Sequence, residues 1–198
     1  PVPTYGAATT ATPTPARPSI VVIGDDFTAG TTMNTGPTWP NLLGLDADVS
    51  TLAVPESGYL VGPASNTFAQ RAATIAADTD VVVFLGGGDD PVGAALQPAV
   101  AAALGAARTA APEARIVVVA PPWTGDPDNI SGNMTARRDA VGAAAAAAGV
   151  EFIDPIADAW FADGTGLIGR DGIHPTDAGH ARMAERLRPV LQSAEATP

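Results

Sequence analysis

The 198-residue sequence contains no cysteine and no lysine. Without cysteine, the fold uses neither a disulfide nor a thiolate metal site. All 10 basic residues are arginine and 21 residues are acidic, which gives a net charge of -11. Because phosphate binding needs a concentrated basic surface, this balance argues against nucleic-acid partners and against docking on anionic lipid.

Long apolar runs are also missing. No uninterrupted stretch reaches the ~18 apolar residues of a membrane-spanning helix, so we expect no transmembrane segment. Hydrophobic residues still make up 46% of the chain. That content and the chain length fit one domain with a sizeable core, which we expect to be a monomer.

The two ends differ in composition from the rest of the chain. Residues 1–18 are rich in Pro, Thr and Ala without apolar periodicity, which predicts a flexible tether. The similar composition of residues 193–198 predicts a disordered tail, so we expect the folded domain to span residues 19–192. The tether and the lysine-free, Ala/Gly/Pro-rich composition favour a secreted or cell-envelope protein of an actinobacterium.

Short Val/Ile-rich runs alternate with helical patterns along the domain. Such runs, bounded by Gly, Pro and Asp, are typical of buried parallel strands, and the alternation predicts an α/β fold with helices on both faces of the sheet. Five strands are expected at residues 20–24, 49–54, 80–85, 115–120 and 150–153. Helices are expected at residues 39–45, 67–77, 91–111, 135–148 and 177–191.

Polar and glycine-rich segments follow the strands, where ligands of parallel sheets bind. Among them, Asp171 and His174 stand three residues apart. This spacing lets the carboxylate face the imidazole of its own loop and fix its tautomer. The chain has only two histidines, and His180 lies inside a predicted helix, where we expect a packing or surface role.

The pattern resembles the SGNH, or GDSL, hydrolase family. The family's first block, Gly-Asp-Ser-x-x-x-Gly, is matched by GDDFTAG at residues 24–30, and its last block, Asp-x-x-His-Pro, by DGIHP at residues 171–175. The second-block glycine matches Gly58, and the third block, Gly-x-Asn-Asp, matches residues 87–90. The resemblance covers residues 19–191 and implies a three-layer flavodoxin-like fold with a five-stranded parallel sheet. It also implies hydrolysis or transfer of ester-linked acyl groups.

Two residues depart from the family pattern. Asp26 stands at the position of the nucleophilic serine, and Asp89 at that of the asparagine that helps to hold the oxyanion. The resemblance makes Asp26, Asp171 and His174 the catalytic positions, and places Gly58 and Asp89 in the oxyanion and substrate pocket. Carboxylates on both sides of His174 would favour its imidazolium form, which is a poor general base.

Three accounts of function follow from these substitutions. The first is a pseudoenzyme that binds a small molecule or glycan in its cleft, with no cofactor and no metal. The second is an active hydrolase or acyltransferase, with Asp26 as nucleophile or Asp26 and Asp89 as an acid-base pair. The third is Ca²⁺ or Mg²⁺ binding by four carboxylates. These belong to Asp25, Asp26, Asp89 and Asp90.

Four aromatic residues are candidates for a sugar- or acyl-binding wall of the cleft, although aromatic side chains more often belong to the core. They are Tyr59, Trp123, Trp160 and Phe161.

Overall fold

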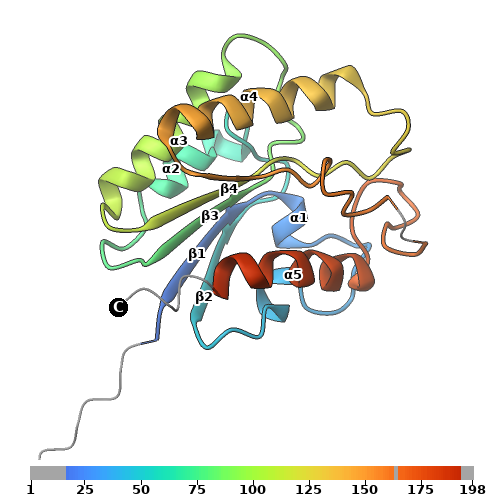
Figure 1. Ribbon diagram of the computed structural model, residues 1–198, viewed down its shortest axis with the longest axis horizontal. Coiled ribbons are helices and arrows are strands. Elements are labelled where there is room, and N and C mark those ends of the chain that lie inside the picture. The colour runs from blue at the N-terminus through green and yellow to red at the C-terminus, as the bar shows by residue number, and fades with distance from the viewer. Residues whose placement is uncertain (1–16, 163–164, 193–198) are drawn as a thin grey trace, which may run out of the picture.

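The computed structural model describes residues 17–162 and 165–192 (Figure 1). Its five strands are all parallel and lie in the order β2-β1-β3-β4-β5, which confirms the predicted α/β fold. The strands are β1 (Ser19–Gly24), β2 (Asp48–Ala53), β3 (Val81–Leu85), β4 (Arg115–Val119) and β5 (Glu151–Ile153).

Helices cover both faces of the sheet (Figure 1). On one face lie α2 (Phe68–Ala72), α3 (Leu96–Ala110) and α4 (Gly132–Ala148). On the other lie α1 (Asp26–Ala29), the 3-10 helix η1 (Trp39–Leu42) and α5 (Asp177–Gln192). A second 3-10 helix, η2, spans Pro63–Ser65. In the part of the chain that the structure describes, no helix has the length and apolarity needed to cross a membrane.

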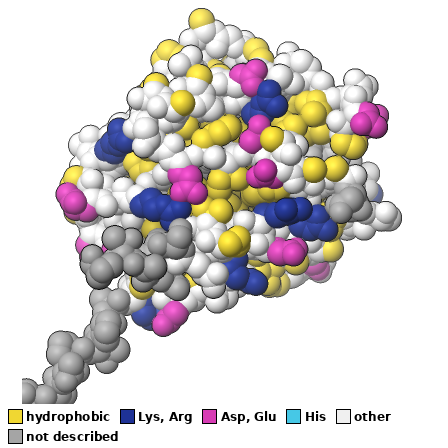
Figure 2. Space-filling model, viewed as in Figure 1, with side chains coloured by type: hydrophobic (Ala, Val, Ile, Leu, Met, Phe, Trp, Pro, Cys, Tyr) yellow, Lys and Arg dark blue, Asp and Glu magenta, His cyan; other side chains and the backbone are white. Residues whose placement is uncertain are grey.

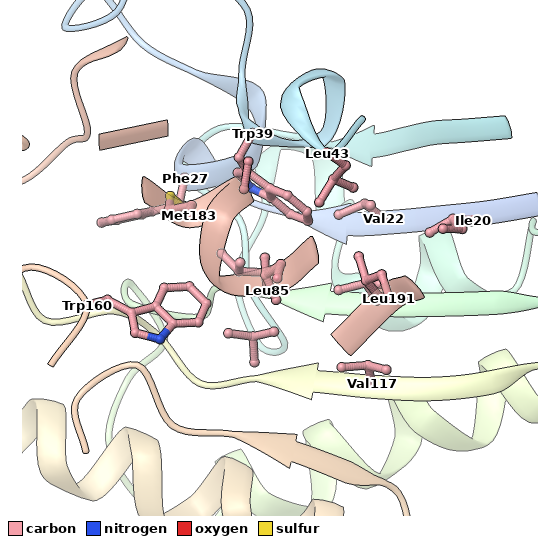
Figure 3. Close-up of a cluster of buried hydrophobic side chains, with 14 of the residues drawn as sticks. Ile20, Val22, Phe27, Trp39, Leu43, Leu85, Val117, Trp160, Met183 and Leu191 are labelled. Atoms are coloured by element: carbon pink, nitrogen blue, oxygen red, sulfur yellow. The ribbon is translucent and has the colours of Figure 1, made fainter. Parts of the chain in front are cut away.

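The central strand β3 is buried on both sides, which explains its unbroken apolar sequence VVVFL. Val81, Val83 and Leu85 join a core with η1 and α5. In Figure 3, Leu85 lies in this core beneath α5, together with Trp39 and Met183. Val82 and Phe84 face the other way, into a core with α2, α3 and α4. The alternation of side chains along one strand therefore supplies both cores.

The predicted strands are all present, whereas several helix ends differ from the prediction. The helix expected from residue 91 begins at Leu96, because Pro91 and Gly93 stand in the preceding loop. The helix expected from residue 135 begins three residues earlier, because the Ser131 hydroxyl caps it by accepting the Met134 N–H at 3.2 Å. The helix α1 was not predicted.

Arg17, at the end of the predicted tether, contacts the loop before β2. Its guanidinium forms ion pairs with Asp46 at 3.1 Å and Asp48 at 3.3 Å, and donates to the Ala47 carbonyl at 2.8 Å. Residues 1–16 of that predicted tether and the predicted tail, residues 193–198, lie outside the described residues. On the face drawn in Figure 2, arginine and acidic side chains are interspersed.

A buried carboxylate joins two loops at the carboxyl end of the sheet. Asp90, after β3, is fully buried and accepts the N–H groups of Tyr59 at 2.8 Å and Leu60 at 2.7 Å, both in the loop after β2. These hydrogen bonds offset the cost of burial, which raises the pKa of Asp90 above its usual value. Gly58 allows this approach, because a Cβ there would lie 2.5 Å from the Asp90 carboxylate oxygens.

We therefore expect Gly58→Ala to destabilise the fold by about 1–3 kcal/mol through overpacking. Gly105→Ala is the matched control, because a Cβ at this α3 position meets nothing within 4 Å. It should be neutral or stabilising by up to ~1 kcal/mol, since alanine has the higher helix propensity. Urea denaturation measures both free energies of unfolding, and equal values for the two variants would contradict the close approach.

His180 on α5 is fully buried, and neither ring nitrogen has a hydrogen-bond partner among the described residues. Burial lowers the pKa of His180 to about 4, against the weaker opposing effect of Asp177. Between pH 6.5 and 4 the unfolded chain therefore binds a proton that the folded chain does not. Stability attributable to this group is present above pH 6.5 and is lost as the pH falls toward 4.

We expect His180→Met to remove this pH dependence, which amounts to ~3 kcal/mol of unfolding free energy between pH 6.5 and 4. The measurement is the free energy of unfolding of wild type and variant at several pH values across this range. Groups such as Asp25 titrate in both proteins, so the difference between the two curves isolates His180. Parallel curves would show that His180 does not titrate as its burial predicts.

Candidate functional site

A cleft of about 310 Å³ opens at the carboxyl ends of β1, β3 and β4. This is the edge at which parallel sheets place ligands. The cleft brings together residues from the segments that follow these strands and from the loop before α5. The lining residues are Asp25, Asp26, Phe27, Gly88, Asp89, Pro121, Pro122, Trp123, Thr124, Met134, Gly172, Ile173 and His174.

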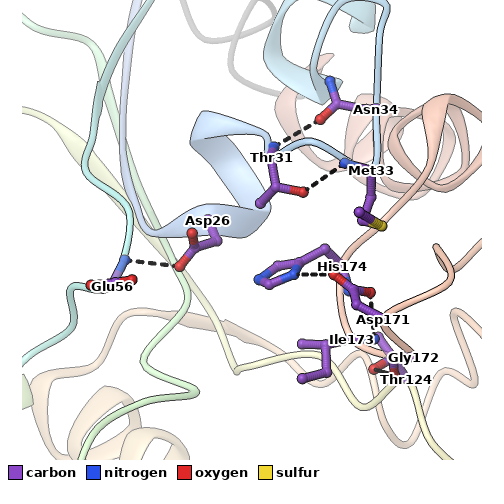
Figure 4. Close-up of polar contacts among 10 residues, drawn as sticks. All are labelled: Asp26, Thr31, Met33, Asn34, Glu56, Thr124, Asp171, Gly172, Ile173 and His174. Carbon is purple, nitrogen blue, oxygen red and sulfur yellow. Dashed lines mark hydrogen bonds and ion pairs between the residues drawn. The ribbon is translucent and has the colours of Figure 1, made fainter.

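Asp171 and His174 form the pair that their spacing predicts. His174 Nδ1 lies 2.7 Å from Asp171 Oδ2, while Asp171 Oδ1 accepts the N–H groups of Ile173 at 3.0 Å and His174 at 3.1 Å. The Ile173 N–H, followed by the His174 side chain, lowers the pKa of Asp171 to about 2. A charged carboxylate therefore holds the ring, which points toward Asp26 in Figure 4.

Asp26 is the first residue of α1, and its Oδ2 accepts the Glu56 N–H at 2.9 Å (Figure 4). Glu56 has a φ of 56°, an uncommon left-handed conformation for a residue other than glycine. The Gly58 N–H instead donates to the Val61 carbonyl at 2.8 Å, and Gly58 does not line the cleft. The backbone donor that faces residue 26 thus belongs to Glu56, a role that no motif in the sequence indicates.

Asp89 lines the cleft, and its side chain makes no hydrogen bond or ion pair with the described residues. Asp25, by contrast, is buried and accepts the N–H groups of Phe27 at 3.0 Å and Gly87 at 2.9 Å. Burial raises the pKa of Asp25 to about 7 despite these bonds, and the charges of Asp26 and Asp89 raise it further. Three carboxyl groups therefore share one end of the cleft.

The four carboxylates proposed as Ca²⁺ or Mg²⁺ ligands have different roles. Those of Asp25 and Asp90 are committed to backbone N–H groups of neighbouring loops. Within residues 17–162 and 165–192, no three His, Cys, Asp or Glu side chains form a group that could hold a metal ion. The geometry therefore gives the metal account no donor set.

The aromatic candidates separate into two groups. Trp123 lines the cleft, and its Nε1–H donates to the Asp126 carbonyl at 2.8 Å. Trp160 and Phe161 are buried, but they line a small apolar cavity of about 40 Å³ that shares Trp123 with the cleft. Tyr59 is a core residue, with its ring centroid 4.7 Å from that of Phe68, so its assignment to a ligand wall is wrong.

The cleft is poor in hydroxyl groups that could act as a nucleophile. Of the lining residues only Thr124 carries one, and it donates to the Gly172 carbonyl at 3.3 Å. The side chain at position 26 is a carboxylate whose Oδ2 is already hydrogen-bonded. The cleft thus combines an oriented imidazole with several acids and has no hydroxyl paired with His174 among the described residues.

Comparison with known proteins places this geometry in a family. The chain is 39% identical over 191 residues to the GDSL lipase Rv0518 of Mycobacterium tuberculosis, an alignment covering 87% of this chain and 80% of that protein. The fold resembles TesA, with a TM-score of 0.72, 23% identity and coverage of 89% of this chain and 99% of TesA. It also resembles the Mycobacterium smegmatis aryl esterase, with a TM-score of 0.58, 18% identity and coverage of 89% and 99%.

These two structural likenesses concern the fold alone. The model of the GDSL-like lipase/acylhydrolase family matches residues 22–182, a range that contains Asp26 and the Asp171–His174 pair. On that match and the mycobacterial relative, the chain belongs to the GDSL-like lipase/acylhydrolase family.

Proposed function

We propose that this chain is a ligand-binding member of its family that has lost ordinary esterase activity. The observation that carries the proposal is the hydrogen bond from the Glu56 N–H to Asp26 Oδ2 at 2.9 Å. In ester hydrolysis, a backbone N–H beside the nucleophile stabilises the oxyanion of the tetrahedral intermediate. Here the Asp26 side chain accepts the N–H that faces this position, so the donor is not free for a substrate.

The magnitudes of the lost interactions support this proposal. Loss of a serine nucleophile costs about 10⁶ in rate, and loss of one oxyanion donor costs about 10²–10³. A carboxylate at position 89 adds repulsion, since two like charges ~4 Å apart repel by ~4 kcal/mol at an effective dielectric of about 20. These effects act on the same intermediate, so ester turnover falls far below that of a serine esterase.

The alternative is an active enzyme that uses Asp26 with the Asp171–His174 pair. The retained contact of 2.7 Å between Asp171 and His174 favours it, because such a pair can activate water. An aspartate attacking an ester forms an anhydride, which is unfavourable, whereas attack on a carbon bearing a leaving group forms an ester. Intact-mass measurement detects this covalent ester on Asp26, and its absence across such substrates argues against the alternative.

We expect wild-type protein to hydrolyse short-chain aryl esters and acetylated sugars no faster than Asp26→Asn. Asp26→Ser alone should gain little, because Asp89 still opposes the oxyanion. Asp26→Ser/Asp89→Asn should gain activity of at least about 10²-fold over the single variant, since it restores both the nucleophile and an oxyanion donor. Initial rates at matched protein concentration measure all four proteins.

The control is His174→Ala in the double-variant background, which should abolish any gain by removing the general base. Turnover by wild type well above Asp26→Asn would overturn the proposal. No gain in the double variant would show that more than these two residues separates the cleft from an esterase, and would leave the wild-type assay to decide the proposal.

We further propose that the protein acts as a monomer outside the cytoplasm, in the secreted fraction or the cell envelope of an actinobacterium. The Pro/Thr/Ala-rich residues 1–18 and the lysine-free composition support this proposal. Fractionation of cells that produce the native protein tests its location, and light scattering tests its oligomeric state.

A further inference from the structure

The cleft has an apolar wall that reaches its mouth. Its apolar lining residues are Phe27, Pro121, Pro122, Trp123, Met134 and Ile173. Ile173, next to the site histidine, is 54% exposed and is one of two large hydrophobic side chains exposed within the described residues. An apolar side chain left open to water at a cleft gains free energy when an apolar group covers it. The ligand is therefore expected to carry an apolar part.

The orientation of Trp123 gives that wall a flat aromatic surface. Its Nε1–H is held by the Asp126 carbonyl, and Gly125 lets the chain pass close to the ring, since a Cβ there would lie 2.5 Å from the indole. The ring also borders the neighbouring cavity, whose volume is only about 40 Å³. A fixed indole with so little space beyond it suits a short apolar group.

The ionisable side chains that line the cleft are mainly acidic. Asp26 and Asp89 line it, Asp171 lies behind His174, and none of the described arginines lines it. A positive charge on His174 would balance only one of the three carboxylates. Arg137 lies nearby, but its Nε–H donates to the Asp90 carbonyl at 2.6 Å, outside the cleft lining. The side chain of Asp89 remains available to a ligand.

From this arrangement we infer that the cleft binds a small organic cation, an amine or quaternary ammonium that carries a short apolar group. The cationic head lies against Asp26 and Asp89, and the apolar group lies along Trp123 toward Ile173. The inference rests on the proposed binding function and names the class of ligand.

Three titrants share a six-carbon chain and differ in the charge of the head group: hexyltrimethylammonium, hexanol and hexanoate. Their affinities therefore show the effect of charge apart from that of the apolar chain. In calorimetric titrations of the whole chain, we expect the cation to bind about tenfold more tightly than hexanol, with hexanoate the weakest, because the carboxylates attract the cation and repel the anion. Added salt should weaken binding of the cation more than that of hexanol.

Two matched variants locate the site, since each removes one negative charge. Asp89→Asn acts in the cleft and should lower affinity for the cation about fivefold without changing that for hexanol. Asp78→Asn acts at an exposed residue before β3, at the amino ends of the strands and away from the cleft. It should change the affinity for neither the cation nor hexanol. Both variants should fold as wild type does, because neither carboxylate makes a hydrogen bond or ion pair with the described residues.

Equal affinities for the cation and hexanol, or equal effects of the two variants, would overturn the inference. So would binding of none of the three titrants, or full displacement of the cation by CaCl₂ at equal ionic strength, which would indicate a metal site. These outcomes concern the ligand class alone. Ester turnover by the wild type is the separate result that overturns the proposed function, so the two failures are distinguishable.

Discussion

Two buried carboxylates hold the loops that form the site. Asp25 accepts a backbone N–H from the loop after β3, and Asp90 accepts N–H groups from the loop after β2. A carboxylate removed from water is costly unless hydrogen bonds replace the lost hydration. These two acids can therefore stay buried only while the loops after β1, β2 and β3 keep the relative positions that form these hydrogen bonds. The positions of Asp26, Glu56 and Asp89 follow from that requirement.

The parts of the fold visible in the sequence are those set by local pattern. The Val/Ile runs indicate the strands because burial on both faces demands an unbroken apolar sequence. The pairing of Asp171 with His174 is also visible, because both residues belong to one short loop and their spacing fixes their geometry. Local pattern does not reveal every short element, since the four-residue helix α1 was not predicted.

The parts that the sequence does not reveal depend on contacts between distant segments. The donor to Asp26 is the N–H of Glu56, which is 30 residues away. Any residue except proline supplies a backbone N–H, so side-chain identity carries almost no signal of this role. The family's second-block glycine instead points to Gly58. The packing of Tyr59 against the rings of Phe68 in α2 and Phe84 in β3 is likewise decided by tertiary contacts and not by its neighbours in the chain.

The contact between Glu56 and Asp26 links the family's framework to the proposed change in its function. A hydrolase needs a hydrogen-bond donor that makes no bond to the protein itself in the free enzyme. That donor then stabilises negative charge as it develops on the substrate. In this chain that donor is already hydrogen-bonded to the Asp26 side chain, beside a second acid at position 89. Under the proposed function, the backbone N–H that would lower a reaction barrier in a hydrolase instead holds an acidic side chain in the cleft. On the proposed function, a positively charged ligand suits this cleft better than the developing oxyanion of an ester does.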